Sequence, residues 1–242
     1  FLPYILGDTD TPMPLFVKPD RKISVQDVKN AMRDHYEGTP LDISKDFGAG
    51  PYHTPYRLSP LSFEVGDKEY FNERPISTQQ SGFVFVAQMR STLPDAIGGV
   101  LWFGTDDANM TVFTPVYCCT DKVPVCYSRV DGADYITFSW NSSFWIFNWV
   151  SNMVYPRYDL MIGDVRATQN ELETTFNEAQ EGIESAAAKL LEKDPAKAKA
   201  FLTNYTNMTA QSAFDTWKRL GEFIIVKYND GVVRKMKDGK FE

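Results

Sequence analysis

The strongest hydrophobic pattern of the chain lies between residues 74 and 117, where three segments rich in Val, Ile, Phe and Trp predict the strands of a central sheet. Leu-Pro-Asp, Gly-Gly and an acidic loop separate them. Successive strand residues point to opposite faces. Residues 81–90 therefore place Phe83, Phe85, Ala87 and Met89 on one face and Val84, Val86, Gln88 and Arg90 on the other. A strand that is apolar on both faces is typical of the inside of a layered domain.

Before this sheet, the pattern predicts mostly irregular chain. Residues 1–22 are rich in proline, and their apolar start, FLPYI, is expected to be covered by the rest of the protein. Ser24 and Asp27 have the spacing of a capping box and predict a helix over residues 24–36 that ends before Gly38. A long ordered loop should follow over residues 39–60. A hairpin over residues 61–73 should turn at Gly66-Asp67.

After Asn141 the hydrophobic period changes to that of a helix. We expect one apolar helix starting at Ser142 or Ser143, a long helix over residues 157–193 and a second over residues 195–227. The short connection between the two long helices predicts that they run antiparallel. A further strand is expected over residues 135–140, and a terminal hairpin with its turn at residues 229–231.

Strands followed by helices predict an α+β fold, because alternating βαβ units are missing from the pattern. The expected layout is loops and strands over residues 1–140, a helical layer over 141–228 and a terminal hairpin over 229–242, all within one domain.

Composition excludes several classes of function. The net charge of −7 and the isoelectric point near 5.0 argue against a nucleic-acid partner, which requires clustered Lys and Arg. No apolar run approaches the ~18 residues of a membrane span. No nucleotide or cofactor fingerprint occurs. His35 and His53 have no second ligand at metal spacing, so neither a metal nor a cofactor is expected.

The three cysteines, Cys118, Cys119 and Cys126, form neither a disulfide framework nor a zinc pattern. Two states stay open: one bridge from Cys118 or Cys119 to Cys126 in an oxidising compartment, or reduced thiols. Asp106 and Asp107 follow a strand and are interpreted as a solvated acidic turn.

Two arginines, Arg74 and Arg90, border the predicted strands, where an unpaired guanidinium would be costly. One interpretation is a structural ion pair with Glu73, Asp95 or Asp46. The other is a fork that binds a substrate carboxylate or polarises a carbonyl.

Several passages carry a family resemblance. They are MRDHYEGTPLDISKDFGAGPY at 32–52, NERPIS at 72–77, MRSTLPDAIGGVLWFG at 89–104 and TVFTPVY at 111–117. In this order and spacing they resemble the later half of the bacterial dipeptidase A-like cysteine dipeptidases, which belong to the N-terminal-nucleophile hydrolases. The similarity extends through the C-terminal helices to the K-x-G-K-F-E end.

The resemblance implies that this chain is part of a four-layer αββα sandwich that hydrolyses dipeptides. In that family the nucleophile is a cysteine at the mature N-terminus, and its own α-amino group serves as the base. Residue 1 of this chain is Phe, and its three cysteines are internal. The resemblance therefore places no catalytic residue in this chain and implies a partner, the N-terminal portion of the same protein, that carries the nucleophile.

The matched polar positions are Arg74, Ser77, Ser81 and Arg90, which the resemblance makes candidates for binding the dipeptide substrate. Gln80 stands where some relatives are expected to carry arginine, so no polarising role is transferred to it. The resemblance also implies a periplasmic or secreted protein, with the cytoplasm as the alternative.

Two hypotheses follow. In the first, the chain is the C-terminal portion of a cysteine dipeptidase, inactive alone, and exposes a large apolar patch where the missing part should pack. In the second, the chain is a non-catalytic extracytoplasmic binding module with an aromatic-lined pocket, and its apolar surface is closed.

Overall fold

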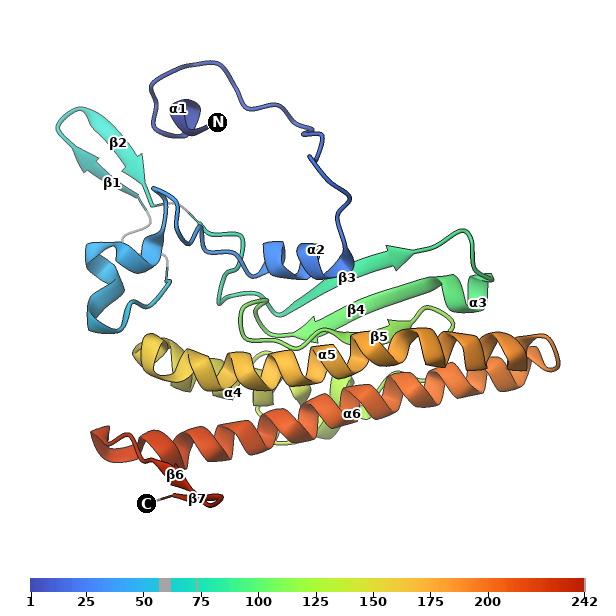
Figure 1. Cartoon of the computed structure of the whole chain (residues 1–242). Helices are drawn as coiled ribbons and strands as arrows, with labels where there is room; N and C mark the ends of the chain where they lie inside the picture. The colour runs from blue at the N-terminus through green and yellow to red at the C-terminus, as the bar shows by residue number, and fades with distance from the viewer. Residues whose placement is uncertain (57–61, 73, 242) are drawn as a thin grey trace.

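The computed structural model describes residues 1–56, 62–72 and 74–241 and has an α+β fold, as predicted (Figure 1). Its centre is an antiparallel sheet in the order β3-β4-β5. The strands are β3 (Phe83–Met89), β4 (Gly99–Thr105) and β5 (Thr114–Tyr117), which confirms the three predicted segments. A short helix, α3 (Asp95–Gly98), connects β3 to β4.

The strand register divides the sheet into two unlike faces. Val86 pairs with Trp102, and Val100 pairs with Tyr117, so these side chains share one face, and all four are buried. We call it the closed face. Phe85 pairs with Phe103 on the opposite face. We call this second face the open face; its side chains are those of Phe83, Phe85, Ala87, Met89, Leu101, Phe103, Thr105, Thr114 and Val116, of which the two threonines are buried.

Helices cover the closed face. They are α4 (Ser143–Val154), η5 (Tyr155–Arg157), α5 (Tyr158–Leu191) and α6 (Pro195–Tyr228). The long pair α5 and α6 lies side by side along the sheet (Figure 1), as the short connection predicts. Asp194 caps α6 by accepting hydrogen bonds from the backbone N–H groups of Ala196 and Lys197. The ring of Phe147 stacks on that of Trp217 at 4.7 Å, so apolar packing joins α4 to α6.

The segment before the sheet contains α1 (Leu2–Ile5), α2 (Val25–Met32), η1 (Ile43–Lys45), η2 (Phe47–Tyr52), β1 (Ser62–Val65) and β2 (Lys68–Phe71). The predicted capping box of Ser24 and Asp27 is present at the start of α2. This helix ends at Met32, before the predicted end, because the Asp34 carboxylate accepts a hydrogen bond from the Tyr36 N–H and turns the chain, with Tyr36 at a φ of 64°.

One predicted strand is absent, and the turn of the predicted terminal hairpin lies elsewhere. Residues 135–140 form no strand; the backbone carbonyls of Asp134 and Thr137 instead accept hydrogen bonds from the Trp145 indole. The terminal hairpin does not turn at residues 229–231, which form the short helix η6 (Asn229–Gly231). The hairpin consists of β6 (Met236–Lys237) and β7 (Lys240–Phe241), because Asp238 and Gly239 both adopt a positive φ and form its two-residue turn.

The apolar start FLPYI is not covered as predicted: Phe1 is 66% exposed and Tyr4 is 40% exposed. The three cysteines are free thiols. Across the described residues, none of the helices combines the length and apolarity that crossing a bilayer requires.

Candidate functional site

Two of the predicted site residues, Ser77 and Ser81, line one cavity at the unpaired edge of β3. Its volume is about 210 Å³. The other lining residues are apolar: Met32 from α2, Ile76, three residues of β3 and Ala108 from the loop after β4. We call this the edge cavity. It is therefore an apolar pocket with two hydroxyl groups on its wall.

Ser77 is held in place from two sides. Its N–H donates to the Asp34 carbonyl at 3.0 Å, and its Oγ accepts a hydrogen bond from the Asn109 N–H at 3.1 Å. The residue is buried. Ser81 is half-buried, and among the described residues its hydroxyl group has no hydrogen-bond partner. Ser77 therefore supports the cavity, whereas the Ser81 hydroxyl is free to bind a ligand.

Arg74 is exposed and lies three residues before Ser77, so their Cα atoms are at most about 11 Å apart. Its carbonyl oxygen accepts a hydrogen bond from the Tyr36 hydroxyl at 3.1 Å, which fixes the backbone. No described residue forms an ion pair with its guanidinium. Glu73, one expected partner, lies outside the described residues. The charge of Arg74 is thus available near the edge cavity.

Arg90 lies at the opposite end of β3, about 23 Å from the start of the strand at the rise of an extended chain. Its Nη1 and Nη2 atoms donate to both carboxylate oxygens of Glu184 on α5, at 2.7 and 2.6 Å. Tyr117 donates to the same carboxylate at 3.1 Å. The ion-pair partner is therefore Glu184, not Asp46 or Asp95, and the structure does not bring Arg90 together with the two serines.

A second cavity, of about 430 Å³, lies beside β3 and also has Phe83 in its wall. We call it the face cavity. Its lining residues are Gly82, Phe83, Phe103, Thr105, Cys126, Tyr127, Ser128, Arg129, Ala133, Asp134, Tyr135, Ser142 and Phe144. Tyr127 is fixed by a hydrogen bond of 2.7 Å between its hydroxyl and that of Thr114. Arg129 and Asp134 form an exposed ion pair at 3.0 Å.

The acidic loop after β4 supports the edge cavity from inside the protein. Asp106 and Asp107 are fully buried, so their interpretation as a solvated turn is wrong. Ser151 and Asn148 donate to Asp106 at 2.8 and 2.9 Å, and the Tyr155 hydroxyl donates to Asp107 at 3.0 Å. Burial raises the pKa of both carboxyl groups above the usual range, and the neighbouring Asp106 carboxylate raises that of Asp107 further.

Asn109 continues this loop and connects it to α5. Its carbonyl oxygen accepts hydrogen bonds from Arg166 at 2.7 Å and from Gln169 at 2.9 Å, while its own N–H reaches Ser77. Because Asn109 is buried, the sequon that begins there is not a glycan acceptor in this fold. The sequence gives no distinctive signal for this loop. Its residues are polar, which predicts exposure to solvent, and only the contacts from α4 and α5 show that they are buried.

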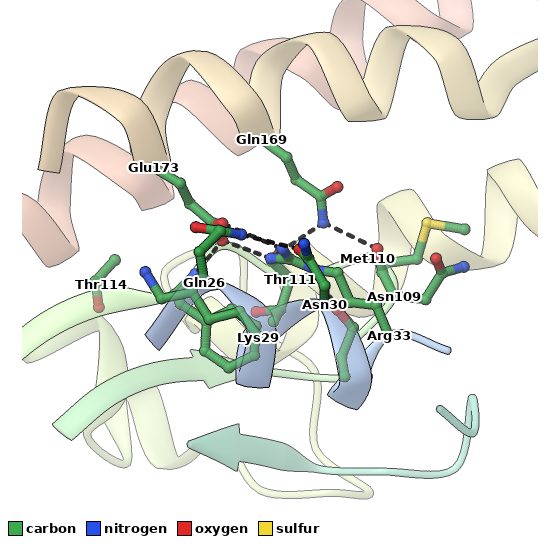
Figure 2. A network of polar contacts seen from close by, with 12 residues as sticks. Gln26, Lys29, Asn30, Arg33, Asn109, Met110, Thr111, Thr114, Gln169 and Glu173 are labelled. Atoms are coloured by element: carbon green, nitrogen blue, oxygen red, sulfur yellow. Dashed lines mark hydrogen bonds and ion pairs between the residues drawn. The ribbon is translucent and has the colours of Figure 1, made fainter. Parts of the chain in front are cut away.

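Figure 2 shows how α2, the loop and α5 are joined by one polar network. Glu173 on α5 accepts hydrogen bonds from both terminal nitrogens of Arg33 and, at 2.9 Å, from the Phe113 N–H. Nearby, the Lys29 ammonium lies 3.6 Å from the centroid of the Trp102 ring. Burial lowers the pKa of Lys29 to about 8. This network fixes α2, and with it Met32, against the edge cavity.

Neither histidine lies in a metal site. Among the described residues no cluster of His, Cys, Asp and Glu is arranged to hold a metal ion. His35 is buried beside Glu37, with 3.1 Å between the ring Nδ1 and the carboxylate, rather than lying at the surface as its place near a helix end suggests. His53 anchors its loop through a contact of 3.1 Å between its ring Nδ1 and the Ser44 carbonyl.

The geometry defines an α+β domain whose central sheet exposes apolar side chains on one face and has two cavities beside Phe83. A model of Peptidase family C69 matches residues 1–171. This chain therefore belongs to peptidase family C69.

Individual relatives agree with this assignment. The chain is 27% identical over 223 residues to a probable dipeptidase B of Lactococcus lactis, a match that covers 88% of this chain and 40% of that protein. It is 34% identical over 104 residues to a probable dipeptidase of Salmonella dublin, covering 43% of this chain and 19% of that protein. Dipeptidase A of Lactobacillus helveticus is 26% identical over 137 residues, a match that covers 57% of this chain and 24% of that protein. The chain thus spans less than half the length of these curated relatives.

Proposed function

We propose that this chain forms the substrate-binding portion of a cysteine dipeptidase of the N-terminal-nucleophile type, whose nucleophilic thiol comes from a preceding part of the same protein. Peptidase family membership and the dipeptidase names of the relatives support the reaction class. The preceding part of the protein would lie on the open face of the sheet and complete the four-layer αββα sandwich.

The open face is the observation that carries this proposal. Phe85 is 49% exposed and Met89 62%, whereas Val84 and Val86, on the other face of the same strand, are buried. Within the described chain, β3 pairs only with β4, so its outer edge is also unpaired. A contiguous apolar face next to a free strand edge is the surface on which another layer packs. The alternative of a closed binding module requires no such face.

The chemistry would proceed by acyl transfer. The α-amine of an N-terminal cysteine takes the thiol proton, the thiolate attacks the peptide carbonyl, and the leaving amine receives the proton. Water then attacks the thioester, and the second product leaves with a carboxyl group as the thiol is restored. The cysteines of this chain do not suit that role: all three are internal. Burial also raises the pKa of Cys126 to about 12, which keeps its thiol protonated.

Within the chain, Arg74 would bind the substrate carboxylate, because its guanidinium is exposed and has no described partner. Ser81 would donate a hydrogen bond to the substrate, and Ser77 would hold the cavity wall against Asn109. Arg90 is engaged by Glu184, and this pair would stabilise the sheet against α5 rather than bind substrate.

The test compares two forms of the protein: this chain alone, and a longer form that includes the preceding polypeptide processed to an N-terminal cysteine. We expect hydrolysis of dipeptides such as Ala-Leu by the longer form only, measured as release of free amino acids. A longer form with that cysteine changed to alanine is the control and should be inactive. Turnover by this chain alone, or by the alanine control, would overturn the assignment of the nucleophile.

A further inference from the structure

The edge cavity and the face cavity share one wall, the side chain of Phe83. We propose that they are two side-chain subsites for a single dipeptide, which lies across Phe83 with its C-terminal residue in the edge cavity and its N-terminal residue in the face cavity. This inference rests on the proposed dipeptidase function and adds the substrate preference of each position.

The shape of a dipeptide suits this arrangement. In an extended chain, successive side chains point to opposite sides, so a ridge between two hollows can receive one side chain on each side. Phe83 forms such a ridge: it is 61% exposed, and its ring stacks on that of Phe103 at 6.0 Å, which holds it upright on the open face.

The edge cavity should prefer an apolar side chain of moderate size. Its volume is about 210 Å³, and six of its eight lining residues are apolar. Of its two hydroxyl groups, that of Ser77 already accepts a hydrogen bond from Asn109, which leaves only Ser81 without a partner. A charged side chain would find no partner of opposite charge in this wall and would lose its hydration.

The face cavity should accept a larger or more polar side chain. It is about twice as large, at about 430 Å³, and its wall combines aromatic rings with the Arg129–Asp134 ion pair. That ion pair is exposed, so both groups can exchange a water contact for a contact with substrate.

Arg74 sets the direction of the dipeptide. It precedes Ile76 and Ser77, which line the edge cavity, and no such free guanidinium belongs to the wall of the face cavity, where Arg129 is paired with Asp134. A carboxylate bound to Arg74 belongs to the C-terminal residue of a dipeptide. The side chain of that residue then enters the edge cavity.

Three matched substitutions test the proposal in the active longer protein. Ser81→Leu fills the edge cavity, Ser128→Leu fills the face cavity, and Ser185→Leu changes a residue in the groove beside Arg90, which belongs to neither. The values of kcat/KM are compared for Ala-Ala, Ala-Leu and Phe-Ala, so that each position of the substrate is enlarged separately.

We expect Ser81→Leu to lower the Ala-Leu to Ala-Ala ratio about tenfold or more and to leave the Phe-Ala to Ala-Ala ratio unchanged. Ser128→Leu should do the opposite, and Ser185→Leu should change neither ratio. Thermal unfolding checks that each variant is folded; if Ser81→Leu is not, Ser81→Val makes the same comparison with a smaller side chain.

The results separate the two proposals. If the parent protein hydrolyses no dipeptide, the proposed function is wrong. If it hydrolyses them but the folded Ser81 and Ser128 variants leave both ratios unchanged, or lower them together, the two-subsite inference is wrong. A reversed pattern, with Ser81→Leu acting on Phe-Ala, overturns the direction that Arg74 sets.

Discussion

The two faces of the central sheet have nearly the same hydrophobicity but opposite surroundings. On the closed face Val86 and Trp102 are buried under α5 and α6, whereas on the open face Phe85 is 49% exposed. A single strand supplies both environments at alternating positions. An apolar pattern therefore indicates which surfaces of a protein are packed against something, but it does not show whether the packing partner belongs to the same part of the chain.

The polar groups differ in the same way. Beside the closed face, Arg33, Glu173 and Arg90 are engaged in ion pairs that join helices to the sheet and its loops. Beside the open face, the side chains of Arg74 and Ser81 have no hydrogen-bond or ion-pair partner among the described residues. Groups without partners cannot be stabilising this part of the fold, so they are the ones available to bind a ligand.

The largest effect on stability should come from the covered side, through Glu173→Gln. This change leaves Arg33 buried without a counter-charge, near Lys29, so we expect a loss of about 3–5 kcal/mol in the free energy of unfolding. The measurement is chemical denaturation of this chain.

The matched control is Glu171→Gln, on the same helix but exposed to solvent, which should leave the denaturation midpoint unchanged. If the two variants were equally stable, the network of Figure 2 would not be what fixes α2 to α5.

The sequence predicts correctly the elements that are determined by residues close together in the chain. The capping box at Ser24, the Gly66-Asp67 turn and the alternation of β3 depend on neighbours along the chain, and all are present. The prediction of a strand over residues 135–140 was wrong because the Trp145 indole, eight residues from Thr137, donates a hydrogen bond to the Thr137 carbonyl inside that segment. Periodicity cannot report such a contact.

The sequence predicts the candidate site only in part, because several of its contacts join residues that are far apart in the chain. Motif matching selected Ser77 and Ser81, and the structure places both in one cavity. It could not separate Arg74 from Arg90, because the distinction depends on Glu184, which lies 94 residues from Arg90 in the chain. Nor could it find Ala108 or the face cavity, since these depend on how distant loops meet β3.

A smaller effect should appear as a pH dependence, through Asp107. Its pKa is raised by burial and by the neighbouring Asp106 carboxylate, so the protonated form is favoured in the folded state. Stability from this pair is then fully present below the ordinary carboxyl range near pH 4 and is lost as the pH rises towards about 8. Asp107→Asn, which cannot ionise, should flatten this decline by at least about 1 kcal/mol.

Urea denaturation at several pH values between these limits measures the slope. Asp159→Asn, at an exposed position in the first turn of α5, is the control and should keep the slope of the parent. A parent chain whose stability rises over this interval would contradict the raised pKa of the buried Asp107 carboxyl group.

The smallest loss of stability in this chain alone should come from Phe85→Ser. The same change tests most directly whether the open face is covered in the longer protein. Because Phe85 is about half exposed, its loss should cost this chain about 1 kcal/mol or less. If another layer covers the open face in the longer protein, the same change should there cost about 3 kcal/mol or more, since it would open a cavity in a core. Val86→Ser, on the closed face, should be equally damaging in both forms. Denaturation of both variants in both forms provides the answer: equal costs for Phe85→Ser in the short and the long form would mean that the open face stays open.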